Sequence, residues 1–191
     1  MNWQNNIVKK IYDLVEDTCK NSPTRPYAAW THHILIVYEI AKDLAIKYDA
    51  DIEICELSAL LHDYSSVSWI WPQEDHHIYG AKLSEEILLK YAYPKEKIEH
   101  VKSCILSHRW SKRMEFESLE AQIIANADAM AHFYCVDSLL YLAYIVHKMN
   151  VDEWTKWVLN KLENSYNKLS SDAKELIDSR YEAIKMIFIK N

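Results

Sequence analysis

Residues 52–63 read IEICELSALLHD, an apolar stretch that ends in a histidine and an aspartate. Asp51 comes directly before it and is a residue type that favours the N-cap of a helix. The apolar residues fit a buried helix face rather than a loop. The sequence therefore predicts a buried helix over residues 52–63, with His62 and Asp63 at its end.

Helical periodicity dominates the rest of the chain in the same way. Loops are expected over residues 21–26, around Trp69, Trp71 and Pro72, and over residues 109–117. Further helices are expected over residues 3–19, 28–48 and 76–91, from Pro94 to His108, from Leu119 onward, and as two or three more helices between Phe133 and the C-terminus. The pattern predicts an all-α fold.

The chain has 191 residues and a single glycine, Gly80. This length corresponds to one domain by the usual prior of ~100–200 residues. Dinucleotide folds and P-loops need several glycines where the backbone approaches phosphate, so both are excluded. Tight hairpin turns also rely on glycine, which again favours helices.

The net charge is −6, so the chain has no basic excess of the kind that general nucleic-acid binding requires. The four cysteines are widely spaced without a CxxC pair, which excludes a zinc ribbon or a redox motif. No signal peptide is visible, and the apolar stretch over residues 139–146 is too short to span a bilayer. We expect a cytoplasmic protein.

The residues capable of chemistry lie at predicted helix ends or on apolar faces. His33 lies on the apolar face of the helix over residues 28–48, His108 ends another apolar face, and Asp128 lies among alanines. A buried carboxylate is costly unless it is paired or bound to a metal. A lone buried histidine is more often a hydrogen-bonded core residue. The order of these residues along several helices nevertheless favours a transition-metal site.

That order resembles the HD-domain superfamily of metal-dependent phosphohydrolases over about residues 27–133. The matching segments are, in chain order, His33, residues 60–63 (LLHD), 76–81 (HHIYGA), 105–109 (ILSHR) and 126–128 (NAD). Gly80 matches the family's glycine, where small size permits close helix packing. The resemblance implies one domain over residues 1–191, with an HD-type core and additional N- and C-terminal helices, the latter over residues 134–191.

The resemblance also implies a ligand set. The family's ligands for the first metal correspond to His33, His62, Asp63 and Asp128. His76 and His108 match further histidines that bind a second metal or a phosphate, and these two and Asp63 are the expected catalytic residues. His77 is the alternative to His76, and the four-residue offset to Gly80 favours His76. The implied cofactor is one or two divalent ions of Mn, Fe, Mg, Co, Ni or Zn.

The chain departs from the family pattern near the expected phosphate. The doublet is often followed by Ile-Gly-Lys, but residues 64–66 read YSS, and the arginine common three residues after the first histidine is Ile36. Arginine suits phosphate recognition, so other cations can take this role. The candidate substrate-binding residues are Arg25, Lys82, Arg109 and Arg113. The alternative is that these residues belong to solvated loops.

Three further residues are candidates near the site. Trp69 and Trp71 lie between the doublet and His76, where they would stack a base or pack a lid against the body. His132 follows Asp128 by one helical turn and is either a structural residue or part of the same site.

The first hypothesis for function is a metal-dependent phosphohydrolase that acts on a nucleotide or another small phosphate ester. The alternatives are an HD-type diiron oxygenase, which would consume oxygen, and a non-catalytic, metal-stabilised ligand-binding module. The expected partner is a small phosphorylated substrate, without general nucleic-acid binding or a membrane; a homodimer is left open.

Overall fold

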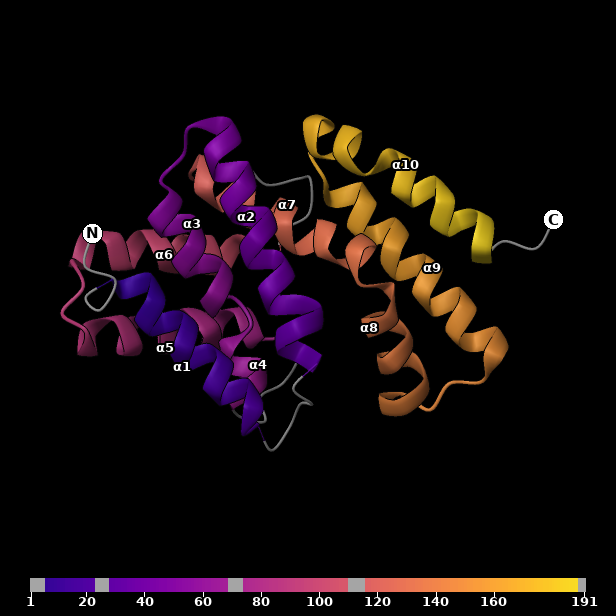
Figure 1. Cartoon of the computed structure of the whole chain (residues 1–191), viewed down its shortest axis with the longest axis horizontal. Coiled ribbons are helices and arrows are strands. Elements are labelled where there is room, and N and C mark those ends of the chain that lie inside the picture. The colour runs from indigo at the N-terminus through magenta and orange to yellow at the C-terminus, as the bar shows by residue number, and fades with distance from the viewer. Residues whose placement is uncertain (1–5, 23–27, 69–73, 110–115, 189–191) are drawn as a thin grey trace.

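The computed structural model describes residues 6–22, 28–68, 74–109 and 116–188, which form an all-α fold (Figure 1). Within these ranges no strand occurs, so the predicted fold class is confirmed. The helices are α1 (Ile7–Lys20), the π-helical segment η2 (Trp30–Ile34), α2 (Leu35–Tyr48), α3 (Ile52–Leu61), α4 (Tyr64–Ser68), α5 (His76–Lys90), α6 (Lys95–Ser107), α7 (Leu119–Tyr134), α8 (Val136–Tyr141), the π-helical segment η3 (Leu142–Val146), α9 (Val151–Lys168) and α10 (Ser171–Phe188).

Helix α3 forms the centre of the core, as its sequence predicts. The Asp51 side chain caps it by accepting a hydrogen bond from the Ile54 amide at 3.2 Å. Leu57, Leu60 and Leu61 are fully buried, and α3 packs against α1, α2, α5, α6 and α7. Because the helix is held on several sides, the two residues that follow Leu61 have a fixed position.

Gly80 allows α5 to pass close to the end of α3. A Cβ atom at this position would lie 3.1 Å from the His62 carbonyl oxygen and 3.4 Å from Ile105 Cγ2. The distance to the carbonyl oxygen is shorter than nine in ten real Cβ contacts, so the neighbouring backbone would have to shift. A side chain here would therefore push α5 away from the residue that begins the His-Asp doublet.

Three helices differ in detail from the sequence expectation. The first helix begins at Ile7 rather than at residue 3, because the Asn6 side chain caps it. The helix expected over residues 28–48 contains a π-helical turn, η2, before α2. Such turns are often found at functional sites, and this one contains His33. Pro94 is the N-cap of α6 instead of lying within its first turn.

A short helix, α4, occupies residues that were expected to be a loop. Ser65 and Val67 of this helix are buried, and Ser22 Oγ donates a hydrogen bond to the Val67 carbonyl at 2.7 Å. The helix packs against α5 and α1. Tertiary contacts thus stabilise a helix that is too short to form on its own.

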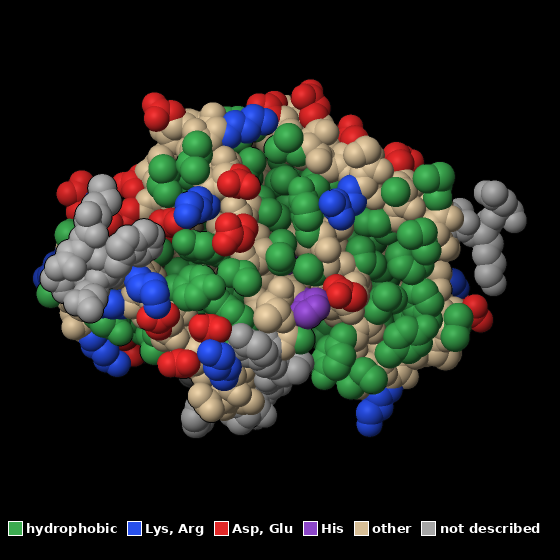
Figure 2. All heavy atoms as spheres, in the orientation of Figure 1, with side chains coloured by type: hydrophobic (Ala, Val, Ile, Leu, Met, Phe, Trp, Pro, Cys, Tyr) green, Lys and Arg blue, Asp and Glu red, His purple; other side chains and the backbone are tan. Residues whose placement is uncertain are grey.

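The C-terminal helices lie on one side of α7. Figure 1 shows α8, α9 and α10 grouped beside α7, with α1 to α6 on its other side. Helix α9 packs against α7, and α10 packs against both. Figure 2 shows hydrophobic side chains on the surface over the C-terminal helices. The exposed large hydrophobic residues of η3, α9 and α10 include Tyr144, Ile145, Val151, Met186 and Ile187.

No single helix of the described chain has the length and apolar composition needed to cross a membrane. Only α7 joined to the following segment Val136–Val146 meets both criteria, and the two parts are bent by 77°.

Candidate metal centre

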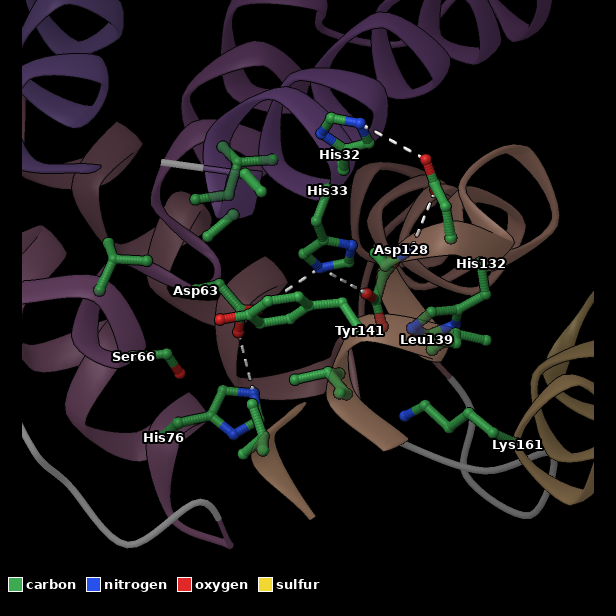
Figure 3. Close-up of a pocket in the computed structure, with 18 of the residues that line it drawn as sticks. His32, His33, Asp63, Ser66, His76, Asp128, His132, Leu139, Tyr141 and Lys161 are labelled. Carbon is green, nitrogen blue, oxygen red and sulfur yellow. Dashed lines mark hydrogen bonds and ion pairs between the residues drawn. The ribbon is translucent and has the colours of Figure 1, made fainter. Parts of the chain in front are cut away.

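Histidine and aspartate side chains from five parts of the chain converge at one place (Figure 3). His33 comes from η2, and His62 and Asp63 directly follow α3. The other three residues are His76 at the start of α5, His108 directly after α6 and Asp128 in α7. The fold thus brings together all the side chains that the sequence analysis assigned to metal binding.

Two groups of three ligand atoms are formed. His33, His62 and Asp128 form the first group. In it, His33 Nε2 lies 3.2 Å from His62 Nε2 and 3.4 Å from Asp128 Oδ1. His62 Nε2 lies 3.9 Å from Asp128 Oδ1. All ligand atoms of the group lie within 4.8 Å of one another, which is close enough for one ion.

Asp63, His76 and His108 form the second group. His76 Nε2 lies 3.1 Å from His108 Nε2 and 3.2 Å from Asp63 Oδ1. His76 and His108 are 7% and 2% exposed, so these two rings are buried more deeply than His33 or Asp128. The ligand atoms of this group also lie within 4.8 Å of one another.

The Asp63 carboxylate lies between the two groups. Its Oδ2 atom is 3.4 Å from His33 Nε2, and its Oδ1 atom is 3.2 Å from His76 Nε2. Oδ1 is buried and accepts no hydrogen bond of regular geometry from the described residues. A carboxylate with one oxygen toward each group has the arrangement needed to bridge two cations.

Two histidines are oriented by backbone carbonyl groups. His62 Nδ1 donates to the Ala59 carbonyl at 2.7 Å, and His108 Nδ1 donates to the Ile105 carbonyl at 2.6 Å. A carbonyl only accepts, so the proton of each neutral ring is on Nδ1. Each Nε2 therefore presents a lone pair to the centre, which is the usual orientation of a metal-binding histidine.

Burial keeps these rings neutral. It lowers the pKa of His62, and it lowers the pKa of His108 to about 3, although the nearby carboxylates act in the opposite direction. Neutral imidazole is the form that binds metals. His33 differs: burial lowers its pKa, but the hydrogen bond and charge of Asp63 outweigh burial, so its pKa is raised.

Both aspartates are ionised at neutral pH. Burial raises the pKa of Asp63, but His62, His33 and His76 outweigh this effect and hold its pKa well below the usual value. The pKa of Asp128 is likewise lowered, because His132 and His33 outweigh burial. Two ionised, partly buried carboxylates in a site of mostly neutral histidines favour a bound cation.

The donor set suits a divalent transition metal. Imidazole nitrogen and carboxylate oxygen are the donors that Mn, Fe, Co, Ni and Zn accept. The observation that supports the fit is the Asp63 carboxylate between the two groups, whose buried Oδ1 lies 3.2 Å from His76 Nε2 without a hydrogen bond of regular geometry from the described residues. His33 would lose its proton on binding, as metal binding generally requires.

The two groups open on a pocket of about 580 Å³. The residues of the centre that line this pocket are His33, Asp63, His76, His108 and Asp128. Segments from η2, α8, η3 and α9 complete the lining. Part of this lining is apolar, with Val67, Leu139 and Leu142, and Tyr141 lies across the opening in Figure 3.

The HD-domain family model matches residues 30–132, which is more than half of the 191-residue chain. The chain belongs to the HD-domain family. The match covers the whole centre from His33 to Asp128 and ends before α8. HD domains bind divalent metals, and the two groups described above can hold such ions.

Solved structures of other proteins share the fold. Bacillus subtilis YpgQ superposes with a TM-score of 0.73 at 18% sequence identity, covering 98% of this chain and 94% of that one. The complex of YpgQ with ADP gives the same TM-score at 19% identity, covering 98% and 93%. An HD-superfamily hydrolase from Bacillus thuringiensis gives 0.70 at 18% identity, covering 94% and 92%.

A protein of Clostridium beijerinckii is more similar in sequence. It is 33% identical over 101 residues, which are 52% of this chain. The matched part spans 62% of the Clostridium protein, less than two thirds of its length.

Of the other residues that the sequence analysis proposed for this HD-domain protein, only some lie at the pocket. His76 points into the centre, whereas its neighbour His77 is in neither ligand group. Arg109 lines the pocket and donates a hydrogen bond to the Glu74 carbonyl. Lys82 is exposed on α5 and is not among the described residues that line the pocket. Arg25, Arg113, Trp69 and Trp71 lie outside the described residues.

Three pocket residues were missed or left open by sequence reasoning. His132 lines the pocket, stacks on His33 with ring centroids 5.7 Å apart, and lies 2.9 Å from Ser165 Oγ through Nδ1. Its one-turn spacing from Asp128 was the available signal. Lys161 and Lys168 of α9 also line the pocket. Nothing in their local sequence distinguishes them from surface lysines.

Proposed function

We propose that this chain is a metal-dependent phosphohydrolase that acts on a nucleotide or another small phosphate ester. The observation that carries the proposal is Asp63, whose two carboxylate oxygens face two separate groups of metal-ligating side chains above a pocket. Such a pair of adjacent cation sites suits a reaction in which charge develops on phosphoryl oxygens.

His33, His62, Asp128 and Asp63 would hold a first divalent ion, and His76, His108 and Asp63 a second. Bound ions of this kind supply Lewis acidity and an acidified water molecule at neutral pH. Asp63 remains ionised, so its carboxylate would serve as a ligand for either ion or would orient the attacking water. The buried, neutral imidazoles of His62 and His108 keep their lone pairs directed at the centre.

The rest of the pocket would position the substrate. Arg109, at its exposed rim, offers a guanidinium group for a phosphate. The apolar wall with Val67, Leu139 and Tyr141 offers a surface for a base or another apolar group. That YpgQ, a structural relative, was solved with ADP supports a nucleotide as the substrate.

The test is hydrolysis by the purified protein loaded with Mn²⁺, Co²⁺, Ni²⁺ or Zn²⁺. A panel of nucleoside mono-, di- and triphosphates and 4-nitrophenyl phosphate is supplied, and released phosphate and pyrophosphate are measured. We expect Asp63→Asn to abolish turnover. Asp43→Asn, which neutralises an exposed carboxylate on α2, should retain it.

The alternative functions give different results in the same experiment. An oxygenase would consume oxygen after iron loading and release no phosphate. A non-catalytic module would bind metal at full stoichiometry without any turnover. Either result would exclude the hydrolase proposal.

A further inference from the structure

Two lysines of α9, Lys161 and Lys168, line the pocket. Figure 3 shows the Lys161 side chain extending from its helix toward the centre, near His132. Both lysines are only partly exposed. Within the described residues, neither ammonium group forms an ion pair or a hydrogen bond with a protein side chain.

Their spacing places them on one face of the helix. They are seven residues apart, which is about two helical turns and about 10 Å along the axis. Lysine side chains are long and flexible, so both can reach the pocket but from different positions along it. Such a pair suits a row of anionic groups better than a single one.

With a divalent ion bound, the formal charges of the pocket would leave a positive excess for an anion. Three carboxylates, those of Asp63, Asp128 and Asp137, are balanced by three cations, those of Arg109, Lys161 and Lys168. Asp137 is in turn 3.4 Å from His32. Each divalent ion held by the centre would add an excess of two positive charges, which phosphate groups would offset.

The positions after the His-Asp doublet and three residues after His33, where the family pattern has a lysine and an arginine, supply no cation for this role. Residues 64–66 after the doublet are Tyr, Ser and Ser, and position 36 is Ile. The electrostatics of Lys168 agree with crowding of positive charge: burial, Lys161 and Arg109 lower its pKa, and Asp128 acts in the opposite direction. A bound polyanion would relieve the repulsion among these groups.

We propose that Lys161 and Lys168 form a subsite for the phosphate groups of a substrate that carries more than one phosphate. The inference rests on the proposed function, since it concerns the same pocket. It makes α9, which lies outside the family match at residues 30–132, part of the substrate site. The lysines would bind the phosphates and select di- and triphosphates over monophosphates.

The test measures binding of inorganic pyrophosphate to the Mn²⁺-loaded protein by isothermal titration calorimetry, with inorganic phosphate as the comparison. The variants are Lys161→Met and Lys168→Met, which keep the apolar stem but lose the charge. The matched control is Lys156→Met, which removes an exposed lysine of the same helix. Metal content is measured before and after each titration.

We expect each pocket variant to bind pyrophosphate about tenfold or more weakly, as for loss of a hydrogen bond to a charged group. Phosphate binding should fall less, Lys156→Met should match the wild type, and metal content should not change. Lys161→Arg should restore part of the affinity. For hydrolysed substrates, KM should rise for di- and triphosphates more than for monophosphates.

Two failures can be told apart. If the wild type does not bind pyrophosphate, or both variants bind it like the wild type, the lysine subsite is wrong even where hydrolysis occurs. If no phosphate compound is hydrolysed but pyrophosphate binding depends on the lysines, the subsite stands and the proposed reaction is wrong.

Discussion

At the scale of single residues, the centre depends on partly buried carboxylates surrounded by histidines. Asp128 lies on a helix of small apolar residues and meets His33, His62 and His132. Asp128→Asn keeps the shape but replaces a charged ligand with a neutral amide. We expect metal affinity to fall by about tenfold or more, measured by competition with a chromogenic chelator.

The same variant separates a ligand from a structural hydrogen bond. The loss of unfolding free energy should be large in metal-containing buffer and small in chelator, because a ligand stabilises the fold through the bound ion. An equal loss in both buffers would remove Asp128 from the metal site.

His76 and His77 provide an internal comparison, because they are adjacent but only His76 belongs to a ligand group. His76→Asn should lower the number of ions bound per chain, whereas His77→Asn should leave it unchanged. Elemental analysis of both variants after metal loading measures this. If the two variants lose the same amount of metal, the second group is assigned incorrectly.

His108 predicts a pH dependence of stability. Its pKa is lowered from 6.5 to about 3 in the folded protein, so below pH 6.5 the unfolded chain takes up a proton that the folded chain does not. Stability contributed by the neutral ring is complete above pH 6.5 and falls as the pH decreases toward 3. At pH 5 the loss is about 2 kcal/mol.

Urea unfolding in chelator at pH 7 and pH 5 measures this loss. His108→Asn should show a smaller difference between the two pH values than the wild type. If the wild type and His108→Asn lost the same unfolding free energy between pH 7 and pH 5, His108 would not be held neutral by burial.

At the scale of elements, the close approach of α5 to α3 predicts the effect of filling Gly80. Alanine has a higher helix propensity than glycine by about 1 kcal/mol, but its Cβ would lie 3.1 Å from the His62 carbonyl oxygen. We expect the clash to dominate and Gly80→Ala to lower the unfolding free energy by about 1–3 kcal/mol. Metal affinity should fall too, because His62 would move.

The control is Glu86→Ala, at an exposed position of the same helix, which should change stability by no more than about 0.5 kcal/mol. A Gly80→Ala protein with stability and metal affinity equal to the wild type would contradict the packing argument.

The long helices could be predicted because their capping residues and apolar faces are local signals. Asp51 and the buried run after it identified α3, and the expected helix over residues 76–91 is α5 (His76–Lys90). The π-helical turn at His33 and the five-residue helix α4 carry no such signal. Both depend on contacts with other helices, so their formation is decided by tertiary packing.

At the scale of the whole molecule, one centre joins helices that are far apart in sequence, from η2 to α7. Binding of a metal at this place should therefore stabilise the entire fold. At a free ion concentration 100 times the Kd, the expected gain is about 2.7 kcal/mol. Thermal unfolding with Mn²⁺ and with chelator measures it, and an unchanged Tm would contradict binding at the centre.

Most residues of the centre stood out in the sequence because they follow or interrupt an apolar helix face, where a charged or polar group needs compensation. His76 did not, and was assigned through the resemblance to the HD-domain superfamily and its offset to Gly80. The lysines of α9 did not stand out either. Lys161 and Lys168 lie in a polar helix with exposed neighbours, and only the packing of α9 against α7 turns them toward the pocket. Long-range placement of this kind leaves no trace in local composition.

The composition of the ligand groups has a consequence for how the protein acquires its metal. Both groups offer nitrogen and oxygen and, among the described residues, no sulfur. Sites of this kind follow the Irving–Williams series, in which affinity rises from Mn²⁺ through Fe²⁺, Co²⁺ and Ni²⁺ to Cu²⁺. Selection then depends on supply: the ion carried by the protein reflects which metals its surroundings make available, and a change in that supply would exchange one ion for another without altering a single ligand.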